Sequence, residues 1–532
     1  MKILMAAAEN DALPNGKVGG IGDVVRDIPL ALADIGQEVD VVMPSYGSFS
    51  KLPSAQYVTS LQVMFGGQAQ TIEIYKVTID SSSEKYSKKV TQWVLEHPLF
   101  AIGGIGQIYC DDPDNRPFAS DATKFALYSA AVAKAIISGV FGKIDVLHLH
   151  DWHTAMVSVL RAYDPEYQAL QSIKTVYTIH NLALQGIRPL DGDESSLKAW
   201  FPNLSFDINQ INDPRYHHCF NPMRAGINLS DKVHAVSPSY AKEILSPSNP
   251  DEGYFGGEGL ENDLKNAADL LKLYGILNGC EYPINIDKNI NVRLNFDDLN
   301  TLCESEILNW VKDKPLEDQA HLIAMARLKQ LSKQKFSSNK EHKQPIIVTS
   351  VGRITAQKVR LFQQVMKNGK TALEQLLAML ADDGVFILLG SGDKKLEGFL
   401  TQIASKYNNF IFLKGYAQNL SENLYSSGDL FLMPSSFEPC GISQMLAMRA
   451  GQPCLAHSVG GLRDTIIDNQ NGFTFNGENP PQQAENMLSR FQSAITMKKQ
   501  KPNLWNEISN NALATRFLWR DVAQDYIKYL YY

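Results

Sequence analysis

Glu438 has the most chemically suggestive setting in this sequence. The apolar run 429–433 is typical of a buried parallel strand, and 441–450 carries apolar residues at helical spacing before Gly451, a favoured helix end. Glu438 is therefore expected on a strand-to-helix turn, at the sheet edge where open α/β folds bind ligands. A helix N-terminus beside it would offer N–H groups and a partial positive charge to an anion.

The same arrangement is repeated directly downstream. Residues 452–458 are strand-like, and Gly460-Gly461 allows the backbone to approach a ligand closely. A single glutamate is more often a capping or surface carboxylate. Here, however, a long block resembles the glycogen and starch synthases, retaining glucosyltransferases of GT-B fold: Phe437-Glu438-Pro439-Cys440-Gly441, then Gln444, Ala447-Met448 and Gly460-Gly461-Leu462 with Asp464-Thr465. The resemblance implies a catalytic role for Glu438 and donor-binding roles for Cys440, Gly441, Gly460 and Gly461.

A pair of cations follows the strand expected at 345–351. Arg353 and Lys358 lie five positions apart, and two cations at a strand end can clamp a diphosphate. As isolated residues they would more often be solvated surface side chains. Residues 352–358 match the Gly-Arg-Ile-Thr-x-Gln-Lys motif of the same family, which implies that both cations act on the leaving phosphate. Val359 replaces the glycine that usually follows, a change in the loop that removes no charge.

A glycine-rich turn lies in the strand-helix-strand unit expected over 3–43. The turn 17–20 is not the dinucleotide fingerprint, and on its own it fits a tight turn and a phosphate cradle equally well. It resembles the Lys-x-Gly-Gly loop of the synthases, although Ile21 and Gly22 stand where the family has Leu-Ala. The resemblance implies a diphosphate and acceptor-side role for Lys17, Gly19 and Gly20.

Three histidines and an aspartate fall within six residues, at His148, His150, Asp151 and His153. Such groups can ligate zinc, but the order differs from that of His-x-His-x-Asp-His hydrolase sites. Alternation along the strand places His148 and His150 on one face, so core histidines are favoured and a metal site is the remote alternative. The pattern His-x-His-Asp-Trp-His matches the synthases, and the resemblance implies that Asp151 lies at the sugar pocket.

Further blocks of the first half carry family motifs. The strand expected at 174–179 leads into His180-Asn181-Leu182-Ala183, and by resemblance His180 contacts the transferred glucose. The passage 221–244 also matches, with Arg224 where the family usually has lysine. Residues 274–279 complete the first domain, and Asn278 is expected near the nucleotide or the cleft.

The composition excludes several classes of function. With a formal charge of −7 and 20% charged residues, the chain has no basic surface suited to nucleic acid. Six scattered cysteines without CxxC pairs favour reduced thiols and a cytoplasmic location. The short apolar run at the start fits a first strand better than a signal peptide, and no run of about 18 apolar residues predicts a membrane span.

We expect an α/β protein of GT-B type, with two doubly wound, parallel-sheet (Rossmann-like) domains facing a deep cleft. The first domain is predicted at 1–280 together with a C-terminal helix at 516–532, and the second at 281–515. The family resemblance fades between 283 and 345. A lysine- and serine-rich stretch at 329–343 has no apolar face and predicts a mobile excursion.

The resemblance implies transfer of glucose from a nucleoside diphosphate sugar to the non-reducing end of an α-1,4-glucan with retention. ADP-glucose is the favoured donor and UDP-glucose is the alternative. Side-chain cations can neutralise the leaving diphosphate, so neither a metal nor another cofactor is required. Three alternatives remain: a GT-B transferase with another donor or acceptor, a non-catalytic sugar-binding protein, and a metal hydrolase. The second is disfavoured because every charged residue of the motifs is present.

Overall fold

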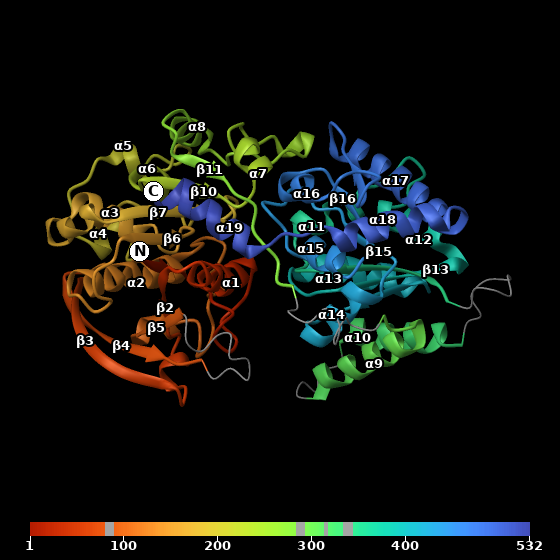
Figure 1. Cartoon of the computed structure of the whole chain (residues 1–532), viewed down its shortest axis with the longest axis horizontal. Coiled ribbons are helices and arrows are strands. Elements are labelled where there is room, and N and C mark those ends of the chain that lie inside the picture. The colour runs from red at the N-terminus through yellow and green to blue at the C-terminus, as the bar shows by residue number, and fades with distance from the viewer. Residues whose placement is uncertain (80–89, 283–292, 313–317, 334–343) are drawn as a thin grey trace. The chain divides into compact units, whose positions relative to one another are not determined.

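The chain forms two compact units. The computed structural model describes residues 1–79, 90–282, 293–312, 318–333 and 344–532. The first unit comprises Met1–Ser248, Gly256–Gly279 and Leu518–Tyr532, and the second comprises Asn249–Phe255 and Cys280–Phe517. Each unit is built on its own sheet, so each can be treated separately (Figure 1).

The first unit contains a mixed sheet with the order β11-β10-β7-β6-β1-β2-β5-β4-β3 among its described strands. The strands are β1 (Lys2–Ala6), β2 (Glu38–Pro44), β3 (Ala55–Phe65), β4 (Gln68–Val77), β5 (Val90–Glu96), β6 (Val146–His150), β7 (Lys174–Ile179), β10 (Lys232–Ala235) and β11 (Leu273–Gly275), with β8 (Arg188–Pro189) and β9 (Cys219–Phe220) pairing separately. Neighbours are parallel except β3 with β4 and β4 with β5, which are antiparallel. The central strand β1 is an apolar run buried on both faces, as parallel sheets require.

Helices cover this sheet. They are α1 (Gly20–Asp34), α2 (Ala119–Ile137), α3 (Met156–Tyr163), α4 (Leu197–Trp200), α5 (Ile208–Ile211), α6 (Pro222–Leu229), α7 (Pro238–Glu243), α8 (Glu261–Asp269) and α19 (Trp519–Asp525), the last continued by a π-helical segment Tyr526–Tyr531. The buried face of α1 includes Val25, Ile28 and Leu32 at helical spacing. The chain's last helix, blue in Figure 1, packs on α1, where Trp519 Nε1 donates to Asp27 Oδ2 at 3.1 Å.

The second unit contains a fully parallel sheet with the described order β14-β13-β12-β15-β16-β17. Its strands are β12 (Ile346–Val351), β13 (Gly384–Leu389), β14 (Phe410–Leu413), β15 (Leu430–Met433), β16 (Cys454–His457) and β17 (Gly472–Phe475). Numbered within the unit, this is the 3-2-1-4-5-6 order of a doubly wound nucleotide-binding fold. The order reverses between β12 and β15, where such folds bind ligands.

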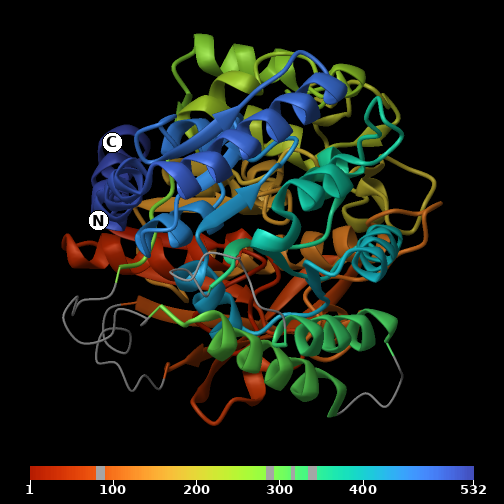
Figure 2. The same cartoon turned by 90° about the vertical axis from the view of Figure 1, so that its right-hand side faces the viewer.

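Two apolar cores lie on opposite faces of this sheet. One contains residues of α12 and α17, and the other contains residues of α9, α10 and α14. The helices are α9 (Phe296–Lys312), α10 (Gln319–Leu331), α11 (Ala356–Gln363), α12 (Ala372–Leu380), α13 (Lys394–Lys406), α14 (Gln418–Ser427), α15 (Ser443–Arg449), α16 (Gly460–Thr465), α17 (Pro480–Gln500) and α18 (Pro502–Ala514). Figure 2 shows α9 and α10, in green, running side by side.

The expected α/β class with parallel sheets in two units is confirmed. The helix expected from 441 begins only at Ser443, because Gly441 has a φ of +74°, which is not helical. Residues 329–331 of the predicted excursion end α10, and 334–343 lie outside the described residues. No helix in the described part of the chain is both long and apolar enough to span a membrane.

Candidate functional site

The second unit places two sequence-distant turns together at the point where its strand order reverses. Lys358, in the first turn of α11, follows β12, and Glu438 follows β15, the strand paired with β12. Lys358 Nζ donates to Glu438 Oε2 at 3.0 Å, and Ser435 Oγ donates to the same oxygen at 3.0 Å. Glu438 is 8% exposed, so this charged pair lies at the edge of the core rather than in open solvent. The arrangement holds a carboxylate and an ammonium where a polar ligand can meet both.

Arg353 differs from Lys358 in its surroundings. Its side chain is exposed, and it makes no hydrogen bond or ion pair with any described residue. Because it lies two residues after the last residue of β12, it stands at the same sheet edge as the pair formed by Lys358 and Glu438. A guanidinium without an internal partner is available to bind a phosphate in two-point fashion.

The turn that carries Glu438 is held by glycines and by backbone hydrogen bonds. The backbone oxygen of Glu438 accepts from Gly461 N at 3.0 Å. A Cβ on Gly461 would lie 2.2 Å from the Cys440 backbone oxygen, and one on Gly441 would lie 2.5 Å from Gln444 Oε1. The described structure therefore brings Glu438, Cys440, Gly441 and Gly461 together, as the sequence predicts. Gly460, with a φ of +43°, begins the short helix beside them.

In the first unit, the glycine-rich turn is organised around Glu9, a residue that no motif of the sequence singles out. Glu9 is buried, and its Oε2 accepts from the backbone N–H groups of Val18 at 2.8 Å and Gly19 at 2.6 Å. Lys17 Nζ pairs with Asp23. Gly20 begins α1, where an added Cβ would meet no atom within 4 Å. The signal for Glu9 was present: a carboxylate just past the carboxyl end of a buried strand.

Asp151 lies at the end of β6, the strand that pairs with β1 where the strand order of the first unit reverses. It has a φ of +54°, and its Oδ1 accepts from His180 N at 2.7 Å. Burial raises the pKa of Asp151 to about 8. The backbone N–H groups of His180 and Asn181 lower this pKa, but their effect is smaller than that of burial. The negative charge of Glu9 adds to the rise. At neutral pH this carboxyl group is therefore mostly protonated and can donate a hydrogen bond.

The histidines of the first unit form a stacked row. The rings of His148 and His150 stack at 4.5 Å, which confirms that they share one face of the strand. His150 Nδ1 lies 2.9 Å from His180 Nε2, and His148 contacts Tyr531 OH and Thr178 Oγ1 at 2.7 and 2.6 Å. Burial lowers the pKa of His148, His150 and His180 well below the usual value, so all three are neutral. Among the described residues no group of three or more histidine, cysteine, aspartate or glutamate side chains could hold a metal.

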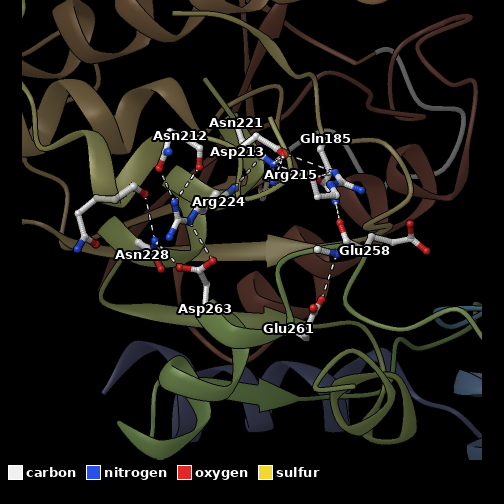
Figure 3. Close-up of polar contacts among 12 residues, drawn as sticks. Gln185, Asn212, Asp213, Arg215, Asn221, Arg224, Asn228, Glu258, Glu261 and Asp263 are labelled. Atoms are coloured by element: carbon white, nitrogen blue, oxygen red, sulfur yellow. Dashed lines mark hydrogen bonds and ion pairs between the residues drawn. The ribbon is translucent and has the colours of Figure 1, made fainter. Parts of the chain in front are cut away.

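Asn278 and Arg224 occupy different settings. Asn278 is buried, and its Oδ1 has no hydrogen-bond partner among the described residues. Arg224 belongs to the polar network of Figure 3, where its Nε donates to Asp263 Oδ2 at 2.9 Å and its Nη1 donates to Asn212 Oδ1 at 2.7 Å. Two hydrogen-bonding nitrogens at fixed angles use the planar fork that a lysine in this position would lack. Arg224 is thus a structural member of the first unit.

Comparison with known proteins gives matches along the chain. Residues 2–266 match the family model described as the starch synthase catalytic domain, and residues 332–505 match the model described as glycosyl transferases group 1. The chain is 31% identical over 544 residues to a glycogen synthase of Desulfitobacterium hafniense (strain DSM 10664 / DCB-2), covering 100% of both. It is 30% identical over 542 residues to a glycogen synthase of Hydrogenobaculum sp. (strain Y04AAS1), covering 99% of this chain and 98% of that one.

Solved structures agree with these matches. The catalytic domain of Starch Synthase IV from Arabidopsis thaliana, bound to ADP and acarbose, is similar with a TM-score of 0.72 and 26% identity, covering 99% of this chain and 98% of that chain. Sucrose-phosphate synthase from Thermosynechococcus elongatus is similar with a TM-score of 0.53 and 16% identity, covering 99% and 97%. At that identity the second likeness bears on the fold alone.

Proposed function

The chain belongs to the glycogen and starch synthase family of GT-B glycosyltransferases, and from this premise we propose that it is a glycogen synthase that uses ADP-glucose as donor. The transfer goes to the non-reducing end of an α-1,4-glucan with retention of configuration. The Arabidopsis relative was solved with ADP and acarbose, which supports a nucleoside diphosphate sugar as donor and a glucan as acceptor.

The observation that carries the proposal is the cluster of Lys358, Glu438 and Arg353 at the strand reversal of the second unit. Breaking the anomeric bond builds negative charge on the leaving diphosphate and positive charge on the sugar. Arg353 and Lys358 stabilise the diphosphate as preorganised cations. Glu438 binds sugar hydroxyls and supports the cationic centre, while Cys440, Gly441, Gly460 and Gly461 shape the turn around the donor.

The first unit supplies the groups that hold the sugar and the acceptor side. Asp151 and His180 lie in direct contact and are both uncharged at neutral pH, so they suit hydroxyl groups rather than phosphate. Asn278 offers a buried amide oxygen without an internal partner. Lys17 and the N–H group of Gly20 serve the diphosphate and acceptor side. Gly19 acts differently, because its N–H group is already bonded to Glu9.

We further place the enzyme in the cytoplasm. None of the six cysteines, which all lie in the described part of the chain, forms a disulfide, and this fits a reducing compartment. The bacterial relatives bear the name of an enzyme of glycogen synthesis. Neither a metal nor another cofactor has a role in the proposed mechanism, since the charge of the leaving group is met by side chains.

A donor panel tests the proposal. The purified protein is given ADP-glucose, UDP-glucose or GDP-glucose with glycogen, and the released nucleoside diphosphate is measured. Release that is fastest with ADP-glucose and depends on glycogen supports the proposal. Faster release with UDP-glucose reassigns the donor, and release that requires a small-molecule acceptor instead of glycogen refutes the glucan acceptor.

A further inference from the structure

We propose that Glu9 is a positioning residue for the glycine-rich turn: its buried carboxylate occupies the place of an anion at Val18 and Gly19. In doing so it leaves the N–H groups at the start of α1 to face a substrate. The inference rests on the proposed function for its link to catalysis, but the contacts that carry it lie wholly within the first unit.

Glu9 satisfies three donors with its two oxygens. Oε2 accepts from Val18 N at 2.8 Å and Gly19 N at 2.6 Å, and Oε1 accepts from Tyr109 OH at 2.7 Å. The residue is only 2% exposed. Successive N–H groups at a turn that opens a helix form an anion site, and here the chain's own carboxylate fills it.

The backbone around Glu9 is fixed from both sides. The preceding Ala8 accepts from Tyr46 OH at 2.7 Å through its backbone oxygen, and the following Asn10 donates through Nδ2 to Gln92 Oε1 at 2.7 Å. Gly16 presses against this segment, since a Cβ there would lie 2.3 Å from the Asn10 oxygen. The carboxylate therefore acts as a rigid anchor for the turn.

The N–H groups of the turn therefore fall into two sets, those bonded to Glu9 and those without a described partner. The N–H groups of Val18 and Gly19 donate to Glu9, whereas those of Gly20 and Ile21 make no hydrogen bond to any described residue. Gly20 has open space where a side chain would stand. Because α1 has 15 residues, its N-terminus also carries the partial positive charge of a full helix. Glu9 thus preforms the turn before any substrate arrives.

Two substitutions separate a hydrogen-bonding anchor from a requirement for negative charge. In Glu9→Gln the amide oxygen can still accept from Val18 and Gly19 while the amide nitrogen donates to the Tyr109 oxygen. Glu9→Ala removes every acceptor. We expect kcat/KM for ADP-glucose to fall roughly 10-fold or more in Glu9→Ala, as for the loss of one oriented group, and to stay well above that level in Glu9→Gln.

Formate supplies a direct probe of the vacated site. In Glu9→Ala, added formate and added formamide should each raise both the melting temperature and the turnover, because each supplies a hydrogen-bond acceptor to Val18 and Gly19, and the wild type should not respond. The melting temperature reports on the contacts of Glu9 even if the wild type transfers no glucose. A failure of this inference can therefore be distinguished from a failure of the proposed function.

Two results overturn the inference. One is a folded Glu9→Ala variant with wild-type kcat/KM. The other is a Glu9→Gln variant as impaired as Glu9→Ala, with no response to formate. If Glu9→Ala does not fold, Glu9→Gln decides alone: near wild-type kcat/KM with a preserved melting temperature supports a hydrogen-bonding anchor, and a large loss of kcat/KM in a folded protein refutes it.

Discussion

Lys358 Nζ lies 3.0 Å from Glu438 Oε2, although the two residues are 80 positions apart in the sequence. They meet because β12 and β15 are neighbours in the sheet, so the turns that follow these strands share one edge. In the proposed reaction a phosphate oxygen competes with Glu438 for the Lys358 ammonium. Each partner thus keeps the other oriented until the donor binds. A substitution of Lys358 should affect the charge on the leaving diphosphate, and a substitution of Glu438 should affect the positive charge on the sugar.

Arg353→Ala should lower turnover by about 10²-fold or more with an unchanged melting temperature. The side chain is exposed and makes no hydrogen bond or ion pair with a described residue, so its removal should cost little stability, while a donor aimed at developing charge is lost. Steady-state kinetics and thermal denaturation measure the two quantities. Arg520→Ala is the matched control: its side chain is also exposed and makes no hydrogen bond or ion pair with a described residue, it lies in α19 of the first unit, and turnover should stay within about 3-fold of wild type. Equal losses in both variants would contradict a specific role for Arg353.

Glu438→Gln should lose more turnover than donor affinity. The amide can still accept from Ser435 and bind sugar hydroxyls, but it brings no negative charge to a developing cation. The measurement is kcat together with the dissociation constant of ADP-glucose from single-turnover kinetics. Parallel losses of binding and turnover would instead make Glu438 a contact of the ground state.

Gly441→Ala should damage both stability and activity. Its φ is +74°, and a Cβ would lie 2.5 Å from Gln444 Oε1 and 3.1 Å from Glu438 Cγ, so the turn that carries the carboxylate must shift. A loss of roughly 1–3 kcal/mol in unfolding free energy is expected by denaturant titration. Gly398→Ala in α13 is the control, because its Cβ meets no atom and a helical Gly-to-Ala change should stabilise by about 0.5–1 kcal/mol. A harmless Gly441→Ala would refute this geometry.

Asp151→Asn should flatten the dependence of stability on pH. The folded pKa of about 8 lies above the unfolded value of about 3.9, so the folded state holds a proton that the unfolded state has lost. The contribution of Asp151 to stability is full below about pH 4 and is lost as the pH rises to 8. Asparagine tolerates the φ of +54° and has no proton to lose. Between pH 5 and pH 8 the unfolding free energy should decrease more for the wild type than for the variant. Equal decreases in the two proteins would contradict the raised pKa.

Local sequence patterns predict the strands and turns of this chain well. The strand expected at 174–179 is β7 (Lys174–Ile179) at the same residues, and the apolar run at 429–433 contains β15. Gly451 follows the end of α15 with a φ of +80°, as a helix-terminating glycine should. These features depend on periodicity and on glycine chemistry, both of which are local.

The contacts between residues far apart in the sequence, and the role of Glu9, could not be predicted from the sequence. Arg353 and Lys358 belong to one motif, but nothing in it shows that Lys358 is paired with Glu438 while Arg353 has no described partner. The role of Glu9 depends on hydrogen bonds to residues nine and ten positions later, which no motif records. The helices α9 and α10 lie in the region where the family resemblance fades, so no family motif predicts them.

The stereochemistry of the product tests the central claim most directly. The protein is incubated with ADP-glucose enriched with ¹³C at C1 and an α-1,4-oligoglucan, and the new anomeric signal is followed by NMR. We predict an α-configured signal in a chain lengthened at its non-reducing end, which is absent with Arg353→Ala over the same period. A β-configured signal, or free glucose without lengthening of the glucan, would contradict a retaining glycogen synthase.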